Sequence, residues 1–101
     1  MRTIFHPARS DLELSAILHA LSDEIRLRVI KKLHDQGELF CSAIEIEIPK
    51  STLSHHFKVL RESGLVHTRI EGTTRYISLR REDLQARFPG LLDTILSLVN
   101  A

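Results

Sequence analysis

The middle of the chain encodes a helix with two distinct faces, within the sequence PKSTLSHHFKVLRESGLV at residues 49–66. Leu53, Phe57 and Leu60 recur at helical spacing and form an apolar stripe. A second face contains no acid and consists of Ser51, Ser54, His55 and Lys58, at i, i+3, i+4 and i+7. Such a helix can bury the stripe and present the polar face to the major groove of a nucleic acid, where hydroxyl, imidazole and amine groups meet base edges and phosphates.

Positive charge is concentrated around this helix. Residues 50–81 contain seven Lys or Arg and two acids, a net charge of +5, whereas the rest of the chain contains seven bases and eleven acids, a net charge of −4. A charge cluster is more commonly a solvated face. Its coincidence with the two-faced helix nevertheless favours an anion-binding surface.

Length and composition limit the alternatives. With 101 residues, 43% of them hydrophobic, residues 1–101 are predicted to form a single domain with a modest core. The single cysteine, Cys41, excludes an internal disulfide and is typical of a reducing compartment. No apolar run is long enough for a signal peptide or a membrane span, so we expect a soluble, cytoplasmic protein with no membrane partner.

Hydrophobic spacing and turn residues predict four helices, a hairpin and a final helix. A loose arm at 1–10 precedes a first helix at 11–21. A second helix is capped by Ser22 and ends at Gly37. Residues 41–48 alternate isoleucine with glutamate, which is a strand pattern, although the overall order of elements favours a short helix.

The second half of the chain has clearer boundaries. The two-faced helix at 49–63 is predicted to end at a left-handed Gly64. A two-stranded hairpin follows at 65–79, and a last helix at 82–99 is interrupted by the pair Pro89-Gly90. The predicted fold class is mainly α with a small β-hairpin.

Three segments resemble the ArsR/SmtB family of bacterial repressors. They are ALSDEIRLRVIKKL at 20–33, similar to the family's second helix, STLSHHFKVLRESGLV at 51–66, similar to its recognition helix and the start of its wing, and RIEGTTRYISL at 69–79, similar to its wing hairpin. The resemblance implies a winged helix-turn-helix fold (ααααββα) and a homodimer. It also implies a sequence-specific, DNA-binding transcriptional regulator, most simply a repressor, with double-stranded DNA as its partner.

The family's metal-site motifs are not found at the matching positions. Many members sense metal through a Cys-x-Cys-type motif before the recognition unit, but residues 38–44 contain only Cys41. Other members bind zinc with Asp and His on the last helix, which here has acids but no histidine. We therefore predict no metal and no cofactor. A metal site that joins scattered histidines such as His6 or His19 across two subunits remains an open alternative.

The charge pattern and the resemblance together select the residues predicted to contact DNA. They are Lys50, Ser51, Thr52, Ser54, His55, Lys58, Arg69 and Arg75. Ser51, Ser54 and His55 are expected to contact base edges, and the cations are expected to contact the backbone. The alternatives are an exposed helix face and ordinary strand charges. For His56, both a DNA contact and a structural hydrogen bond remain open.

The terminal helices at 11–21 and 82–99 carry more apolar surface than one small domain can cover. We therefore predict that they form a two-fold dimer interface, with a purely intramolecular core as the alternative. The predicted interface residues are Leu14, Ile17, Leu18, Leu91, Leu92, Ile95 and Leu98. Two recognition helices would then lie ~34 Å apart along DNA and bind a near-palindromic operator.

The sequence contains no glycine-rich phosphate loop and no nucleophile elbow, so no enzyme activity is predicted. Cys41 is most simply a small buried hydrophobe, with thiol sensing as an alternative. A small-molecule or protein effector, thiol sensing and constitutive repression remain three possible modes of regulation. The rival function is a winged-helix module that binds only proteins, against which the concentrated positive charge argues.

Overall fold

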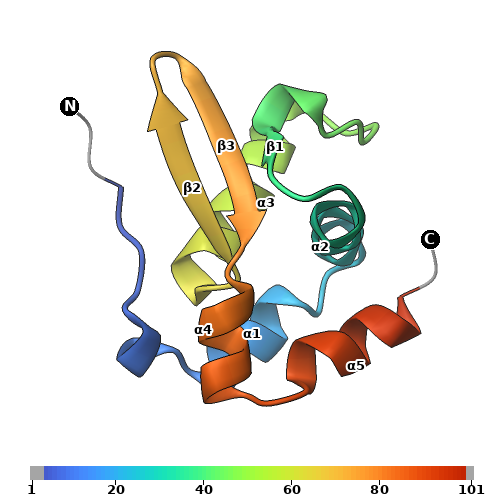
Figure 1. The fold of residues 1–101 in the computed structure, drawn as a ribbon. Helices are drawn as coiled ribbons and strands as arrows, with labels where there is room; N and C mark the ends of the chain where they lie inside the picture. Colours follow the sequence, from blue (N-terminus) through green and yellow to red (C-terminus); the bar gives the residue numbers. More distant parts are fainter. Residues whose placement is uncertain (1–3, 100–101) are drawn as a thin grey trace.

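The computed structural model describes residues 4–99, in which helices pack against a small antiparallel sheet (Figure 1). In chain order, the elements are η1 (Arg9–Asp11), α1 (Leu14–Ala20), α2 (Glu24–Gln36), β1 (Leu39–Phe40), η2 (Cys41–Ala43), α3 (Lys50–Ser63), β2 (Val66–Glu71), β3 (Thr74–Leu79), α4 (Arg81–Arg87) and α5 (Leu91–Leu98). The mainly helical architecture with a β-hairpin confirms the predicted fold class. No helix in this part of the chain is long and apolar enough to cross a membrane.

The hairpin of β2 and β3, called the wing below, occupies the predicted residues and stands at one end of the molecule (Figure 1). Its strands pair Glu71 with Thr74, so the turn between them consists of two residues. The first, Gly72, has a φ of 63°, a conformation that favours glycine. The sheet also has a third strand, β1, which pairs with β3 in the order β1-β3-β2. The sequence pattern missed it because two residues show no alternation.

The first two helices begin later than predicted. Residues 11–13 do not start a helix, since η1 closes at Asp11 and α1 begins only at Leu14. The cap of α2 is Asp23, whose carboxylate accepts the Arg26 N–H at 3.0 Å, whereas the Ser22 hydroxyl donates to the carbonyl of His19. Both Ser and Asp are good caps, but the turn after α1 places Asp23 rather than Ser22 directly before the first residue of α2. The predicted end of α2 at Gly37 is confirmed.

The ambiguous segment 41–48 is neither a strand nor a full helix. It contains one 3₁₀ turn, η2, followed by irregular chain. Ile44 is buried in the core, while Ile46 and Ile48 are partly buried against it. The alternating isoleucines therefore fill the space beside α3 from an irregular segment, and the expected short helix was wrong beyond its first turn.

The predicted interruption at Pro89-Gly90 separates the last helical segment into α4 and α5. The core that holds all these elements together is aliphatic. It includes Ile17 of α1, Ile30 of α2 and Ile77 of β3, all fully buried. Because α3 and the wing pack on the same core, the fold fixes their relative orientation.

Candidate nucleic-acid interface

Helix α3 buries the side that faces α1 and α2 and leaves its first half open to solvent. Leu53, His56 and Leu60 are buried, whereas Phe57, predicted on the same stripe, is only partly buried. Six predicted DNA-contact residues are exposed: Lys50, Ser51, Thr52, Ser54, His55 and Lys58. Within residues 4–99, no hydrogen bond or ion pair joins any of these six side chains to another group. Their donors and acceptors are available to a ligand.

The end of α3 is fixed by glycine. Gly64 has a φ of 93° and caps the helix in the predicted left-handed conformation. A side chain at this position would also overlap Cδ2 of Leu12. The chain can therefore turn from α3 into β2 while the N-terminal segment packs directly against the turn.

His56 is held inside the protein by a buried arginine. Arg26 of α2 is only 8% exposed, and its guanidinium donates to the Ala20 carbonyl at 2.6 Å and lies 3.1 Å from Nδ1 of His56. Because a guanidinium only donates, Nδ1 of His56 accepts this bond. These contacts settle the open question about His56 in favour of a structural role. The sequence analysis missed Arg26, since nothing in its spacing separates a buried arginine from a solvated one.

The same network includes the cap of α2. The Asp23 carboxylate lies 3.8 Å from Nδ1 of His56. Burial raises the pKa of Asp23, but the hydrogen bond from the backbone N–H of Arg26 and the positive charge of the Arg26 side chain outweigh it, so the pKa is lowered overall. Carbonyl groups at the end of α1, the charged Asp23 and Arg26 at the start of α2 and the imidazole of His56 in α3 are thus joined in one network, which fixes the orientation of α3.

The wing has two faces, and its two predicted DNA-binding arginines lie on opposite ones. Arg75 pairs with Ile70, whereas Arg69 pairs with Tyr76, and neighbouring positions on a strand point to opposite sides. Arg75 lines a cavity of about 350 Å³ between α3 and the wing, together with Ser54 and Lys58 of α3. The structure therefore brings Arg75 together with the exposed half of α3.

Arg69 is engaged within the protein. Its guanidinium donates to Glu71 and, at 3.0 Å, to Glu38, and it lies 4.3 Å from the ring centroid of Tyr76. The hydrogen bonds that Arg69 donates to Glu38 and then to Glu71 raise the pKa of Arg69. Glu38 precedes β1, so this cluster joins both edge strands across β3. The positive charge of Arg69, which was predicted to contact the DNA backbone, is thus already balanced by Glu38 and Glu71.

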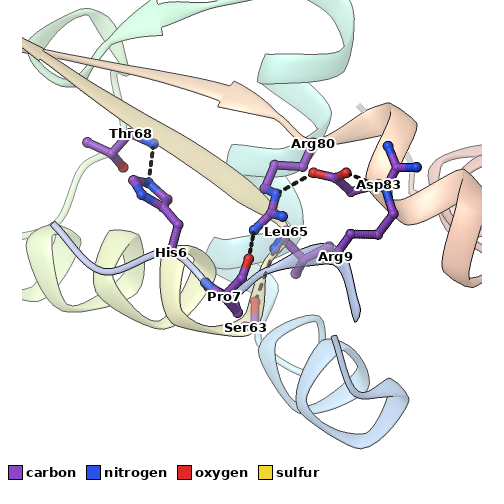
Figure 2. A network of polar contacts seen from close by, with 8 residues as sticks. All are labelled: His6, Pro7, Arg9, Ser63, Leu65, Thr68, Arg80 and Asp83. Atoms are coloured by element: carbon purple, nitrogen blue, oxygen red, sulfur yellow. Dashed lines mark hydrogen bonds and ion pairs between the residues drawn. The ribbon is translucent and has the colours of Figure 1, made fainter. Parts of the chain in front are cut away.

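The arm predicted at 1–10 is not loose where the structure describes it. Residues 4–12, called the N-terminal strap below, run beside the wing (Figure 1) and are hydrogen-bonded to it and to the ends of α3 and β3. Figure 2 shows these contacts, with His6 next to Thr68 of β2 and the Pro7 carbonyl next to Arg80. Residues 1–3 lie outside the described part of the chain.

The seven predicted dimer-interface residues divide into three groups by their exposure. Ile17 is fully buried within the chain and Leu92 nearly so, so these two belong to the chain's own core. Leu91 and Ile95 are partly buried. By contrast, Leu14 and Leu18 of α1 are 45% and 46% exposed, and Leu98 of α5 is 73% exposed. The first and last helices thus retain an uncovered apolar surface.

In the described part of the chain, the structure gives little support to metal binding or to thiol chemistry. Within residues 4–99, no group of three or more His, Cys, Asp or Glu side chains is placed to hold a metal ion. Cys41 is half-buried, and burial raises the pKa of its thiol more than the nearby Arg75 lowers it. A thiol with a raised pKa is largely protonated and a weak nucleophile at neutral pH.

Comparisons with known proteins agree with this geometry. Residues 21–69 match a family model described as a helix-turn-helix domain. The chain is 45% identical to the uncharacterized HTH-type transcriptional regulator YceK of Bacillus subtilis, over 86% of the chain and 91% of that protein. It is 37% identical to the arsenical resistance operon repressor of Staphylococcus aureus, over 87% of the chain and 78% of that protein.

A solved structure supports the same fold. The crystal structure of an ArsR family transcriptional regulator superimposes with a TM-score of 0.65 and covers 80% of this chain and 90% of that one, at 24% identity. The identity and coverage of the sequence relatives go beyond a shared fold. The chain therefore belongs to the ArsR family of winged helix-turn-helix, DNA-binding transcriptional regulators.

Proposed function

We propose that the protein is a repressor that binds a near-palindromic operator as a homodimer, with α3 in the major groove. The observation that carries this proposal is the exposed, acid-free first half of α3, whose polar side chains have no partner within residues 4–99. Ser51, Ser54 and His55 contact base edges, and Lys50 and Lys58 contact phosphates.

The wing contributes one arginine to this interface in preference to the other. Arg75 borders the cavity that also contains Ser54 and Lys58, so a phosphate there would meet cations from both α3 and the wing. Arg61 lines the same cavity, although its Nε already donates to the carbonyl of Phe5. Arg69 stabilises the wing through Glu38 and Glu71.

Binding of the purified protein to a labelled fragment of its own promoter region, at several salt concentrations, tests the proposal. Lys58→Ala is expected to weaken binding to all sequences and to reduce the slope of log affinity against log salt by about 0.9. His55→Ala is expected to reduce discrimination between operator variants by about 1–3 kcal/mol. Lys32→Ala serves as the control, because Lys32 lines a groove between α2 and α5 that includes no residue of α3 or the wing. Wild-type behaviour of both interface variants would refute the assignment of α3.

The proposed dimer rests on the exposed leucines of α1 and α5. An uncovered apolar surface from the first and last helices is what a two-fold interface would bury. Leu18→Glu is expected to shift the protein from dimer to monomer in size-exclusion chromatography with light scattering. Phe40→Glu is a matched control, because Phe40 is 44% exposed but lies on β1. Dimers that persist in Leu18→Glu would exclude this interface.

The rival proposal is a module that binds only proteins. Its expected result is binding of a protein partner that does not depend on salt, with no retention of DNA in the promoter assay. The unpaired cations of α3 and the wing favour the DNA-binding proposal, because a surface that meets only protein needs no such concentration of positive charge. The regulating effector, if the protein has one, would be a small molecule or a protein.

A further inference from the structure

The N-terminal strap crosses the junction between the recognition helix and the wing. The Phe5 carbonyl accepts from Nε of Arg61 at 3.2 Å, near the end of α3, and the Pro7 carbonyl accepts from Nη1 of Arg80 at 2.7 Å, directly after β3. Further along, Nε of Arg9 donates to Asp83 of α4 at 2.7 Å. The strap thus joins α3, the end of the wing and α4, which are separate elements in the chain. Figure 2 shows the contacts of the strap with Arg80 and Asp83.

His6 joins this strap to the wing itself. Its Nε2 accepts the backbone N–H of Thr68 at 3.0 Å. Thr68 lies on β2, which is an edge strand because the sheet order is β1-β3-β2. The imidazole therefore gives a partner to a partly buried backbone N–H on the open edge of the sheet, where no further strand pairs with β2. The ring of His6 also stacks on the ring of His67, with 4.4 Å between the ring centroids.

The charged groups around His6 favour its neutral form. His67 from β2, Arg61 from α3 and Arg80 after β3 face it, and the adjacent cavity of about 550 Å³ is also lined by Arg81, Glu82 and Asp83. Of the two acids, Asp83 is already hydrogen-bonded to Arg9 and Arg80.

The pKa of His6 reflects these surroundings. Burial lowers it most, followed by the charges of His67, Arg61 and Arg80, and a hydrogen bond with the backbone of Ile4 offsets this only in part. A protonated imidazole would also carry a hydrogen on Nε2, which cannot accept the Thr68 N–H. Protonation therefore removes the bond and adds a positive charge among cations.

We propose that His6 is a positioning residue for DNA binding, which fastens the strap across the α3–wing junction when neutral and releases it when protonated. In the fastened form, the strap holds the wing at a fixed angle to α3. In the released form, the Thr68 N–H loses its partner and the wing can move relative to the recognition helix. The protein then binds its operator more weakly in mild acid, a consequence that rests on the function proposed above.

The direction of the pH dependence follows from the lowered pKa. The ordinary pKa of a histidine side chain is 6.5, and the pKa of His6 in the fastened strap is lower than this. The fastened form is therefore fully stable above pH 6.5 and loses stability as the pH falls below it, because the released form binds the proton more tightly.

Amide hydrogen exchange at Thr68 tests the strap without DNA. The protection factor, which corrects for the intrinsic pH dependence of exchange, is compared between about pH 7.5 and about pH 5. In the wild type it is expected to fall by about three-fold to ten-fold, the equivalent of one hydrogen bond. In His6→Gln, whose amide oxygen can accept the same bond without titrating, it is expected to remain constant. His19→Gln, at an exposed histidine of α1 away from the strap, is the matched control and is expected to retain the wild-type pH dependence.

DNA affinity provides the second readout. The comparison is made between wild type and His6→Gln, which share every other titratable side chain. His6→Gln is expected to bind as tightly as wild type at about pH 7.5 and about three-fold to ten-fold more tightly at about pH 5. His6→Ala is expected to bind more weakly at both.

Two results would overturn the proposal. One is a Thr68 protection factor that does not change with pH in the wild type. The other is the same pH dependence in His6→Gln as in wild type. A wild type that fails to bind DNA at any pH, with the expected protection pattern at Thr68, would instead refute the proposed function and leave the strap intact.

Discussion

The exposed half of α3 and the face of the wing that carries Arg69 and Tyr76, called the outer face below, both contribute positive charge. The two surfaces differ in whether these charges have partners within the protein. On α3, Lys50 and Lys58 are exposed, with no partner in the described part of the chain. On the outer face of the wing, Arg69 is held by two glutamates and a tyrosine ring.

The difference shows that a count of positive charges overstates the surface available to DNA. A cation that already donates to carboxylates must give up those bonds before it can displace counterions from a phosphate. Within residues 50–81, Arg61, Arg69 and Arg80 all donate to groups within the protein. The net charge of +5 between residues 50 and 81 is therefore a property of the segment and not of one binding face.

The largest expected effect comes from the most buried of the paired cations. Arg26→Ala removes the donor that satisfies His56 and the Ala20 carbonyl, and we expect a loss of about 3 kcal/mol in the free energy of unfolding, measured in urea. Arg28→Ala, an exposed arginine on the same helix, should change it by no more than about 0.5 kcal/mol. Equal effects would mean that the buried network does not fix α3.

A pair of wing variants separates Arg75, for which residues 4–99 provide no hydrogen-bond or ion-pair partner, from the paired Arg69. We expect Arg75→Ala to reduce the slope of log affinity against log salt by about 0.9, because one phosphate contact is lost. Arg69→Ala should leave that slope unchanged, since its charge is already balanced by Glu38 and Glu71. A reduced slope in Arg69→Ala, without one in Arg75→Ala, would reverse the assignment of the two faces.

The smallest effect concerns Asp83 of α4, the carboxylate that pairs with Arg9 of the strap. Hydrogen bonds from Arg9 and Arg80 lower the pKa of Asp83 below its usual 3.8, so the stability it contributes is present above pH 3.8 and is lost as the pH falls further. Asp83→Asn should therefore be less stable than wild type by about 1 kcal/mol or less at neutral pH. The difference should shrink between neutral pH and about pH 2, as the carboxylate of Asp83 begins to be protonated. A constant difference in urea unfolding at both pH values would show that the ion pairs are not its source.

Local pattern was sufficient for the elements whose own residues carry the signal. The 3.6-residue spacing in α3, the left-handed Gly64 and the glycine turn of the wing were predicted at nearly the observed positions. The same reasoning failed at 41–48, where alternate isoleucines pack into the core from irregular chain. Periodicity reports which side chains are buried, and only hydrogen bonding to other elements determines whether the backbone between them is regular.

The candidate site divides in the same way. The exposed face of α3 follows from helical spacing, whose geometry is local. The strap, the burial of Arg26 and the pairing of Arg69 with Glu38 depend on contacts between residues far apart in the chain, such as His6 with Thr68 and Arg26 with His56.

The sequence by itself determined which helix is polar on one face, where that helix stops and where the wing turns, because spacing and glycine conformation act within a few residues. Only the tertiary structure decided which of the chain's cations remain available to DNA. A positive side chain pairs with whichever acid, carbonyl or ring the fold brings within reach, and that choice is set by packing between distant segments.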